Sequence, residues 1–376
     1  MNRLLYISED YYESKVHHNL CRMIAAQNDV AITVYSPKRK IKNSGCTINQ
    51  TYRGINYETL LGYISVNSTR YKFDFNYKIR KKYGYLDNHI NLSSFDKTYA
   101  ATLFSEGAIA YRIFKKYSVP YTVAVRGTDI SLYLKFMPHL WWLGRQIIKH
   151  ASRVIFVTER IKQEVLGSFA LSGLKEVIEH KGTIITNGID DIWFGMLKPK
   201  KQTASPYKVI YIGNLGSNKN VLSLQNAIEK VRKIGIPATL SIIGGSGDQE
   251  KTVLKRCIQH PEYFSYLGKI YDKKLLAEKI REHDLFAMCS HGETFGLVYL
   301  EAMSQGIPVV YSKGQGIDGC FTEKIGEAAN SRSVNEIASA IKNVITNYGC
   351  YTLIGDRIFD FKWENISKAY YQAIFV

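Results

Sequence analysis

The chain has 376 residues, of which 45% are apolar and 22% charged, and this composition is that of a globular protein rather than a disordered or fibrous one. The length predicts two domains. No apolar run reaches the ~18 residues that a membrane-spanning helix needs, and residues 1–12 predict a buried strand rather than a signal peptide.

The net charge of +17 is the strongest signal in the composition. Residues 1–195 contain 27 Lys and Arg against 16 Asp and Glu (+11), and the remainder contains 23 against 17 (+6). Two basic segments, 36–42 and 70–85, lie in the first part. The excess predicts an anionic partner, such as a membrane surface, a polyanion or a phosphorylated ligand, or else a solvated face. Nucleic acid is not favoured, because no helix-turn-helix, zinc-finger or RNP-type motif accompanies these segments.

The six cysteines are scattered, without a C-x-x-C pair or a histidine at metal-ligand spacing. This pattern predicts free thiols in a reducing cytosol, not disulfides or a zinc site. We therefore expect a cytoplasmic protein.

Short β-branched runs alternate with amphipathic helical segments, which is typical of βα units around parallel sheets. Helices are predicted at 108–116 and 158–166, and residues 36–97 are interpreted as strands and loops inserted into the first domain. Strands are predicted at 4–8, 30–35, 99–104, 121–126, 153–157 and 183–186.

A polar segment with prolines, 198–208, interrupts this alternation and is the predicted linker. After it, a helix is predicted from an apolar face formed by Val221, Leu224, Ile228 and Val231. Further strands are predicted at 209–213, 239–245, 264–267, 285–288 and 307–311. We expect two similar βα domains, 1–197 and 209–360, with a ligand cleft at the carboxyl ends of their strands.

The segment HGETFGLVYLEAMSQGIPVV, residues 291–310, predicts a turn, a helix capped by Gly306 and a strand. Gly296 leaves the helix start accessible, so that a phosphate can reach bare backbone N–H groups. Glu293 and Glu301 are eight positions apart, which spans roughly 12 Å along a helix. Because the two carboxylates of glycosidases lie only ~5–9.5 Å apart, these acids either contact different parts of one long ligand or do not act together.

Three other glycine turns follow predicted strands. Residues 211–220 bring Lys219 to the mouth of the same sheet, where a cation suits a phosphate. Residues 242–250 run into glycines at a sheet edge. Residues 314–319 form a literal G-x-G-x-x-G, but late in the second domain, which favours a donor-side loop or a plain turn over a dinucleotide site.

Residues 291–310 resemble the E-x7-E segment of the family 4 glycosyltransferases, which are retaining enzymes with the GT-B fold. Segments 151–159, 185–190, 211–219, 240–247, 266–270 and 361–371 follow in the order of that family, so the resemblance covers most of the chain. It implies an α/β protein with two Rossmann-like domains that face each other across a cleft, and a C-terminal helix that packs back towards the first domain.

The resemblance also implies roles for single residues. Glu293 matches the glutamate that binds the donor sugar, and Glu301 matches the one that binds the nucleoside ribose. Lys219 matches the lysine that neutralises the leaving diphosphate, and residues 266–270 would lie beside the nucleobase. The diphosphate itself would be held by the amides of Thr294, Phe295, Gly296 and Leu297.

The mechanism implied is a front-face displacement with retention, in which the leaving phosphate helps to deprotonate the acceptor. It needs no metal and no cofactor, and the chain contains no D-x-D triplet. A nucleotide-sugar, with a UDP-sugar favoured, is the expected donor, and a glycan or lipid-linked molecule of cell-envelope polysaccharide or glycolipid synthesis is the expected acceptor.

Two positions depart from the pattern of the family. Asn214 stands where the family usually has an arginine, and Arg126 stands where it often has a histidine. Arg126 cannot act as a base at neutral pH, but it can supply the missing positive charge to the diphosphate, which is our hypothesis. His17 and His18, which lie in the segment that replaces the usual glycine pair, are interpreted as structural or as neighbours of the acceptor.

Trp141 and Trp142 lie beside basic residues in 139–150, which predicts either an interfacial helix or packing in the core. The first alternative would attach the protein to the inner face of the cytoplasmic membrane. Three function classes remain: a glycosyltransferase, which the residues favour, a nucleotide-sugar epimerase of the same architecture, and a non-catalytic binding or accessory protein.

Overall fold

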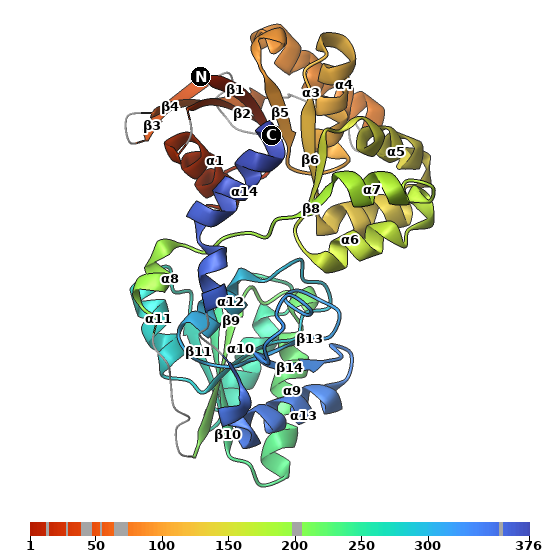
Figure 1. The fold of residues 1–376 in the computed structure, drawn as a ribbon. Helices are drawn as coiled ribbons and strands as arrows, with labels where there is room; N and C mark the ends of the chain where they lie inside the picture. Colours follow the sequence, from red (N-terminus) through yellow and green to blue (C-terminus); the bar gives the residue numbers. More distant parts are fainter. Residues whose placement is uncertain are drawn as a thin grey trace. The chain divides into compact units, whose positions relative to one another are not determined.

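The computed structural model describes residues 1–12, 15–27, 29–38, 47–52, 55–63, 74–197, 205–352 and 356–376. The chain forms two compact units (Figure 1). Unit 1 contains residues 1–187 and 363–376, and unit 2 contains residues 188–362. No helix of the described residues is long and apolar enough to cross a membrane.

Unit 1 is built on a sheet with the strand order β3-β4-β2-β1-β5-β6-β7-β8. Every neighbouring pair is parallel except β3 and β4. The strands are β1 (Asn2–Ile7), β2 (Val30–Lys38), β3 (Thr47–Tyr52), β4 (Ile55–Tyr63), β5 (Lys97–Ala100), β6 (Tyr121–Val125), β7 (Arg153–Phe156) and β8 (Gly182–Ile184).

Helices cover both faces of this sheet. Successive side chains of a strand point to opposite faces, so Leu4 and Tyr6 of β1 lie in one core cluster and Leu5 and Ile7 in another. The first cluster packs against α1 (Lys15–Gln27) and α14 (Trp363–Phe375), which lie side by side in Figure 1. The second packs against α3 (Phe75–His89), α4 (Ser105–Tyr117) and α5 (Trp141–His150). Two further helices of unit 1 are α6 (Glu159–Leu166) and α7 (Lys175–Lys181).

The structure confirms most of the predicted elements of unit 1. The strands expected at 4–8, 30–35, 121–126 and 153–157 are β1, β2, β6 and β7, and the expected helices are α4 and α6. The strand expected at 99–104 ends at Ala100, because the N–H groups of Leu103 and Phe104 donate to the carboxylate of Asp129 at 3.0 and 3.1 Å instead of to a neighbouring strand.

The interpretation of 36–97 as strands and loops is wrong over residues 75–89, which form α3. Asp74 caps this helix by accepting a hydrogen bond from the N–H of Tyr77 at 2.9 Å, and Ile79 and Leu86 form its buried face. The basic segment 70–85 is therefore helical from residue 75. Residues 39–46, 64–73 and 198–204, the last within the predicted linker, lie outside the described residues.

Unit 2 contains six parallel strands in the order β11-β10-β9-β12-β13-β14. This is the strand order of a doubly wound Rossmann sheet, in which the direction of winding reverses at the first strand. The strands are β9 (Tyr207–Gly213), β10 (Ala238–Gly244), β11 (Phe264–Gly268), β12 (Leu285–Met288), β13 (Val309–Ser312) and β14 (Gly326–Ala329).

The helices of unit 2 are α8 (Asp191–Gly195), α9 (Val221–Lys233), α10 (Glu250–Gln259), α11 (Lys273–Arg281), α12 (Leu297–Ser304) and α13 (Val334–Thr346). The predicted apolar face of α9 is confirmed, since Val221, Leu224, Ile228 and Val231 are all buried. The strand expected at 307–311 starts at Val309, because the N–H of Ile307 still bonds the end of α12.

The boundary between the units lies earlier than the sequence suggests. Residues 188–197, expected in the first domain, belong to unit 2. Trp193 in α8 is fully buried in the core of that unit, and Arg281 donates to the carbonyl of Met196 at 2.8 Å. The C-terminal helix α14 belongs to unit 1.

Candidate active site

The loops that carry Lys219 and Glu293 meet where the winding of the sheet of unit 2 reverses. Lys219 follows β9 and Glu293 follows β12, and these two strands are parallel neighbours. β10 and β11 lie on one side of this pair, and β13 and β14 lie on the other. Ligands of open α/β sheets bind at this switch point, beyond the carboxyl ends of the strands.

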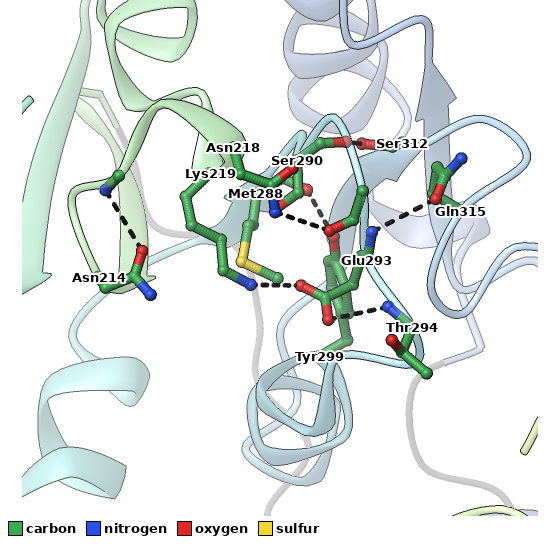
Figure 2. A network of polar contacts seen from close by, with 12 residues as sticks. Asn214, Asn218, Lys219, Met288, Ser290, Glu293, Thr294, Tyr299, Ser312 and Gln315 are labelled. Atoms are coloured by element: carbon green, nitrogen blue, oxygen red, sulfur yellow. Dashed lines mark hydrogen bonds and ion pairs between the residues drawn. The ribbon is translucent and has the colours of Figure 1, made fainter. Parts of the chain in front are cut away.

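Lys219 and Glu293 form an ion pair at this point. Lys219 Nζ lies 2.6 Å from Glu293 Oε2 (Figure 2), and the two side chains are only 22% and 13% exposed. The loops are also joined by their backbones, since His291 N donates to the carbonyl of Asn218 at 2.8 Å. Asn218 Nδ2 donates in return to the carbonyl of Gly292 at 2.9 Å. The two charged groups are therefore held in place by both loops.

The G-x-G-x-x-G segment supports Glu293 from the other side. Gly316 N donates to the carbonyl of Glu293 at 3.1 Å, and Glu293 N donates to Gln315 Oε1 at 3.3 Å. Gly316 has a φ of +59°, and a Cβ there would lie 3.1 Å from Glu293 Cγ. Of the two interpretations of 314–319, the donor-side loop fits these contacts, and Gln315 is a residue that the motif alone did not single out.

The start of α12 is open beside Glu293. Gly296 has a φ of +80°, and a Cβ at this position would lie 2.5 Å from the ring of Tyr299. That ring is immobilised by burial and by a hydrogen bond from its hydroxyl to the carbonyl of Met288 at 2.5 Å. The first N–H groups of an α-helix have no partner within it, so Leu297 N presents a donor at the start of α12. Just before it, Thr294 N donates to Glu293 Oε1 at 3.2 Å, which joins this backbone to the carboxylate. The side chain of Phe295 is buried, so this residue offers only its backbone.

Glu301, on the same helix, lies in a charged cluster of its own. Burial raises its pKa to about 7, although nearby Lys273 acts in the opposite direction and Asp190 reinforces the rise. Lys273 forms an ion pair with Asp190. These residues come from α12, α11 and the start of α8, which contact one another. The carboxyl group of Glu301 is thus about half-protonated at neutral pH.

Asn214 is exposed, and its hydrogen bonds stabilise the turn in which it lies. Its Oδ1 accepts a hydrogen bond from Gly216 N at 3.3 Å (Figure 2). Its carbonyl accepts one from the hydroxyl of Tyr211 at 2.6 Å. The segment 242–250 packs against the same turn, since Ser217 N donates to Asp248 Oδ1 at 2.8 Å. The position that carries an arginine in the family therefore supplies no cation here.

Arg126 belongs to unit 1, whereas all the other predicted site residues belong to unit 2. It follows β6, and its guanidinium donates from Nε to the carbonyl of Ala101 and from Nη1 to Asn187 Oδ1, both at 3.2 Å. Its Nη2 is buried without a hydrogen-bond partner among the described residues. Arg126 thus ties the carboxyl ends of β5 and β6 to Asn187, the last residue of unit 1 before the chain enters unit 2.

The structure favours the structural interpretation of His17. Its Nδ1 lies 2.7 Å from the buried hydroxyl of Tyr6. Burial, and to a lesser degree the charge of Arg126, lower the pKa of His17 to about 3, so it is neutral at physiological pH. His18 is half-buried with Nδ1 3.3 Å from the hydroxyl of Tyr11, and burial likewise lowers its pKa.

Unit 1 carries a second charged cluster that the sequence did not reveal. It lies at the carboxyl ends of β1 and β5, where the winding of this sheet reverses. Glu9 N donates to Glu106 Oε1 at 2.9 Å, and the carboxylate of Glu9 pairs with Lys82. Lys82 is 1% exposed, and burial lowers its pKa to about 8. The sequence did not predict this contact, because Lys82 lies on α3, in a segment that was interpreted as strands and loops.

The described residues contain no group of three or more His, Cys, Asp and Glu side chains that is able to hold a metal ion. The cysteines among them, Cys21, Cys257, Cys289, Cys320 and Cys350, are not joined in disulfides.

Comparisons with known proteins show what the chain is similar to. Residues 206–347 match the family described as Glycosyl transferases group 1. Glycogen synthase of Mycobacterium tuberculosis is 26% identical over 253 residues, which are 65% of this chain and 58% of that protein, so the match spans little more than half of the relative.

Two solved structures resemble the whole chain. Sucrose-phosphate synthase from Thermosynechococcus elongatus aligns with a TM-score of 0.74 and 16% identity, over 99% of this chain and 98% of that one. The trehalose-6-phosphate structure from E. coli bound with UDP-2-fluoro glucose aligns with a TM-score of 0.69 and 11% identity, over 99% and 98%. The chain thus has the GT-B fold of glycosyltransferases, and its second unit carries the match to the group 1 glycosyl transferases.

Proposed function

We propose that the protein is a retaining glycosyltransferase that binds a nucleotide-diphosphate sugar at the switch point of unit 2. The observation that carries this proposal is the Lys219–Glu293 ion pair beside the open start of α12, with Glu301 farther along the same helix. Glu293, then Lys219 with the backbone at the start of α12, and then Glu301 would match in turn a sugar, a diphosphate and a ribose.

Each group then has one task. Lys219 and the amides from Thr294 to Leu297 neutralise the diphosphate, which stabilises the charge that develops as it leaves. Glu293 accepts hydrogen bonds from hydroxyls of the donor sugar, and Glu301 accepts them from the ribose. The UDP-sugar analogue bound to the E. coli relative supports a UDP-sugar as the donor.

The reaction balances without a further reagent. The acceptor oxygen bonds to the anomeric carbon on the face from which the bond to the phosphate oxygen breaks. The proton of the acceptor hydroxyl passes to that phosphate oxygen. The chain supplies no covalent nucleophile in this scheme, and its residues bind, orient and balance charge.

The acceptor is expected at unit 1, where Glu9, Lys82 and Glu106 occupy the switch point of the other sheet. Hydroxyl groups of a glycan or of a lipid-linked sugar suit such a polar cluster. Arg126 retains its proposed role as the cation that replaces the family arginine at Asn214.

One assay tests the proposal against the epimerase and the non-catalytic protein. Release of nucleoside diphosphate is measured from UDP-, GDP- and ADP-sugars, with and without candidate acceptors. The transferase releases it only with an acceptor, whereas an epimerase converts the sugar without release and a binding protein does neither.

The same assay, applied to variants, tests whether the predicted residues form the donor site. Glu293→Gln should lower acceptor-dependent release by about 100-fold or more, as does the loss of other preorganised polar groups. Lys219→Met removes a charge-assisted contact and should weaken UDP binding by roughly 10- to 100-fold. Lys233→Met, an exposed lysine at the end of α9, is the matched control and should change neither quantity. Full activity in Glu293→Gln would contradict the assignment of the site.

A further inference from the structure

Unit 1 exposes a group of large apolar side chains that the proposed reaction does not use. Leu132, Phe136, Trp142 and Phe169 are 39%, 64%, 68% and 81% exposed, and we call these four residues the aromatic face. The segments that carry them, 129–140, α5 and 169–171, contact one another, so the four residues belong to one part of unit 1. The cost of leaving such side chains in water is high, and exposed apolar residues that gather in one place mark interaction sites.

The aromatic face is held by ordered elements. Trp141 belongs to the core side of α5, and its Nε1 donates to the carbonyl of Leu134 at 3.0 Å. Its ring centroid lies 6.2 Å from that of Phe169, edge to face. Arg145 Nη1 donates to the carbonyl of Ala170 at 3.3 Å and so joins α5 to the turn of Phe169. Each of the two expected alternatives thus fits one tryptophan. Trp141 packs towards the core, whereas Trp142 is exposed to solvent, as an interfacial residue would be.

The surroundings of the aromatic face are basic. Residues 130–158 contain no Asp or Glu. Lys135 directly precedes Phe136, and Arg145 follows Trp142 by three positions on α5, so that these two lie on the same side of that helix. Lys135 Nζ lies 5.2 Å from the ring centroid of Phe136. Asp129, which precedes this stretch, is buried, and its oxygens accept hydrogen bonds from backbone N–H groups. No carboxylate from residues 130–158 therefore opposes an anionic surface at this face.

We propose that the aromatic face docks the protein on an anionic lipid surface. Tryptophan and phenylalanine enter the boundary between headgroups and acyl chains, while neighbouring lysines and arginines contact lipid phosphates. A protein partner fits this chemistry less well, since lysine is depleted at protein interfaces but attracted to anionic headgroups.

The position of the aromatic face bears on the acceptor. The 3-residue step from Arg126 to Asp129 leads from the carboxyl end of β6 directly into the segment with Leu132 and Phe136. The face therefore adjoins the edge of unit 1 at which we expect the acceptor, so docking would bring that edge to a lipid-linked acceptor. This link rests on the proposed function, whereas docking itself rests on the aromatic face alone.

Flotation with vesicles tests docking on the full chain. The protein should float with phosphatidylcholine vesicles that contain phosphatidylglycerol, and much less with phosphatidylcholine alone. Because each aromatic contributes about a tenfold gain in partitioning, Phe136→Ser with Trp142→Ser should lower binding at least tenfold. The matched control is Ile258→Ser with Tyr271→Ser, whose side chains are 80% and 84% exposed in unit 2, and it should bind like the wild type.

Two further measurements test the contribution of charge to vesicle binding and check that the variants fold. Lys135→Glu should weaken binding at low salt more than at high salt. All variants alter exposed side chains and should keep the wild-type Tm. Absence of wild-type flotation, or equal flotation of the Phe136/Trp142 variant, overturns the proposal. It is also overturned if that variant changes only the oligomeric state in size-exclusion chromatography, which would make the face a protein interface.

The two proposals fail separately. Acceptor-dependent release with a water-soluble acceptor should be unchanged in the Phe136/Trp142 variant, because the variant leaves the donor site intact. Vesicle binding without any transferase activity would refute the proposed function and leave docking standing. Transferase activity without vesicle binding would refute docking alone.

Discussion

Glu301→Gln should stabilise the protein and weaken nucleotide binding at the same pH, two effects of opposite sign from one carboxyl group. In the folded protein burial raises the pKa of Glu301 to about 7 from its ordinary value of 4.5. The folded state therefore retains a proton on Glu301 between pH 4.5 and 7 that the unfolded chain has lost. Stability is highest below this window and falls as the pH rises through it, because the folded protein must then hold a poorly solvated charge.

The size of the effect follows from the shift. The difference between a pKa of 4.5 and one of about 7 sets an upper limit of about 3.4 kcal/mol on the change that Glu301 makes to the free energy of unfolding. Glu301 is only half-buried, so solvent screening reduces this to about 2 kcal/mol. Glutamine has nearly the same shape and does not ionise. The Tm of Glu301→Gln relative to wild type should therefore rise by about 4–8 °C between pH 4.5 and 8.5, for a unit of this size.

Nucleotide binding should change in the other direction. Ribose hydroxyls donate to the carboxylate, so ionised Glu301 binds UDP more tightly, and at pH 8 the glutamine variant should lose about tenfold in affinity. The difference should shrink at pH 6, where most wild-type Glu301 is protonated. The phosphates of UDP titrate equally in the measurements on wild type and on Glu301→Gln. The ratio of the two affinities at each pH therefore does not contain their contribution.

Thermal unfolding followed by tryptophan fluorescence, with calorimetric titration of UDP, measures both quantities. Lys273→Met should raise the pKa of Glu301 further and move the midpoint of the UDP pH profile upwards. Lys274→Met, one residue along α11 and exposed, should leave it in place. A Tm difference that does not vary with pH would refute the raised pKa, and unchanged UDP affinity in Glu301→Gln would refute its contact with the nucleotide.

Two further predictions concern geometry. Gly296→Ala places a methyl group against the ring of Tyr299 at a φ of +80°, so it should lower the free energy of unfolding by about 2–4 kcal/mol and reduce UDP affinity. Gly235→Ala, at φ +84° with no atom within 4 Å, should cost only about 1 kcal/mol, and equal losses of stability would show that the ring contact is unimportant. Arg126→Ala should weaken UDP-sugar binding if its guanidinium serves the diphosphate. Asn187→Ala removes only the hydrogen-bond partner of Arg126 at 3.2 Å, and an equal loss in this variant would instead make Arg126 a positioning residue.

The amino-acid sequence alone determined the βα alternation and the place of the donor loops. Continuous apolar runs at 209–212 and 285–288 form most of β9 and the whole of β12, because parallel strands that are buried on both faces favour such residues. Gly296 and Gly306 predict the limits of α12, since both positions require a left-handed backbone, and the structure shows φ values of +80° and +79° there. These properties depend on residues that are close in the sequence, so the sequence alone is enough to predict them.

Other features depend on contacts between distant segments, and only the tertiary structure decided them. The early end of β5 depends on Asp129, which captures two N–H groups that follow the strand. The raised pKa of Glu301 depends on burial among α8, α11 and α12, and Trp193 joins unit 2 because its large ring is buried there.

The burial of Lys82 beside Glu9 joins residues 73 positions apart, and no local spacing encodes it. Trp141 and Trp142 are adjacent in sequence, yet one packs into the core and the other faces solvent, because neighbouring residues on a helix point about 100° apart. A sequence records which side chains are present, but burial and charge depend on what the rest of the chain places around them.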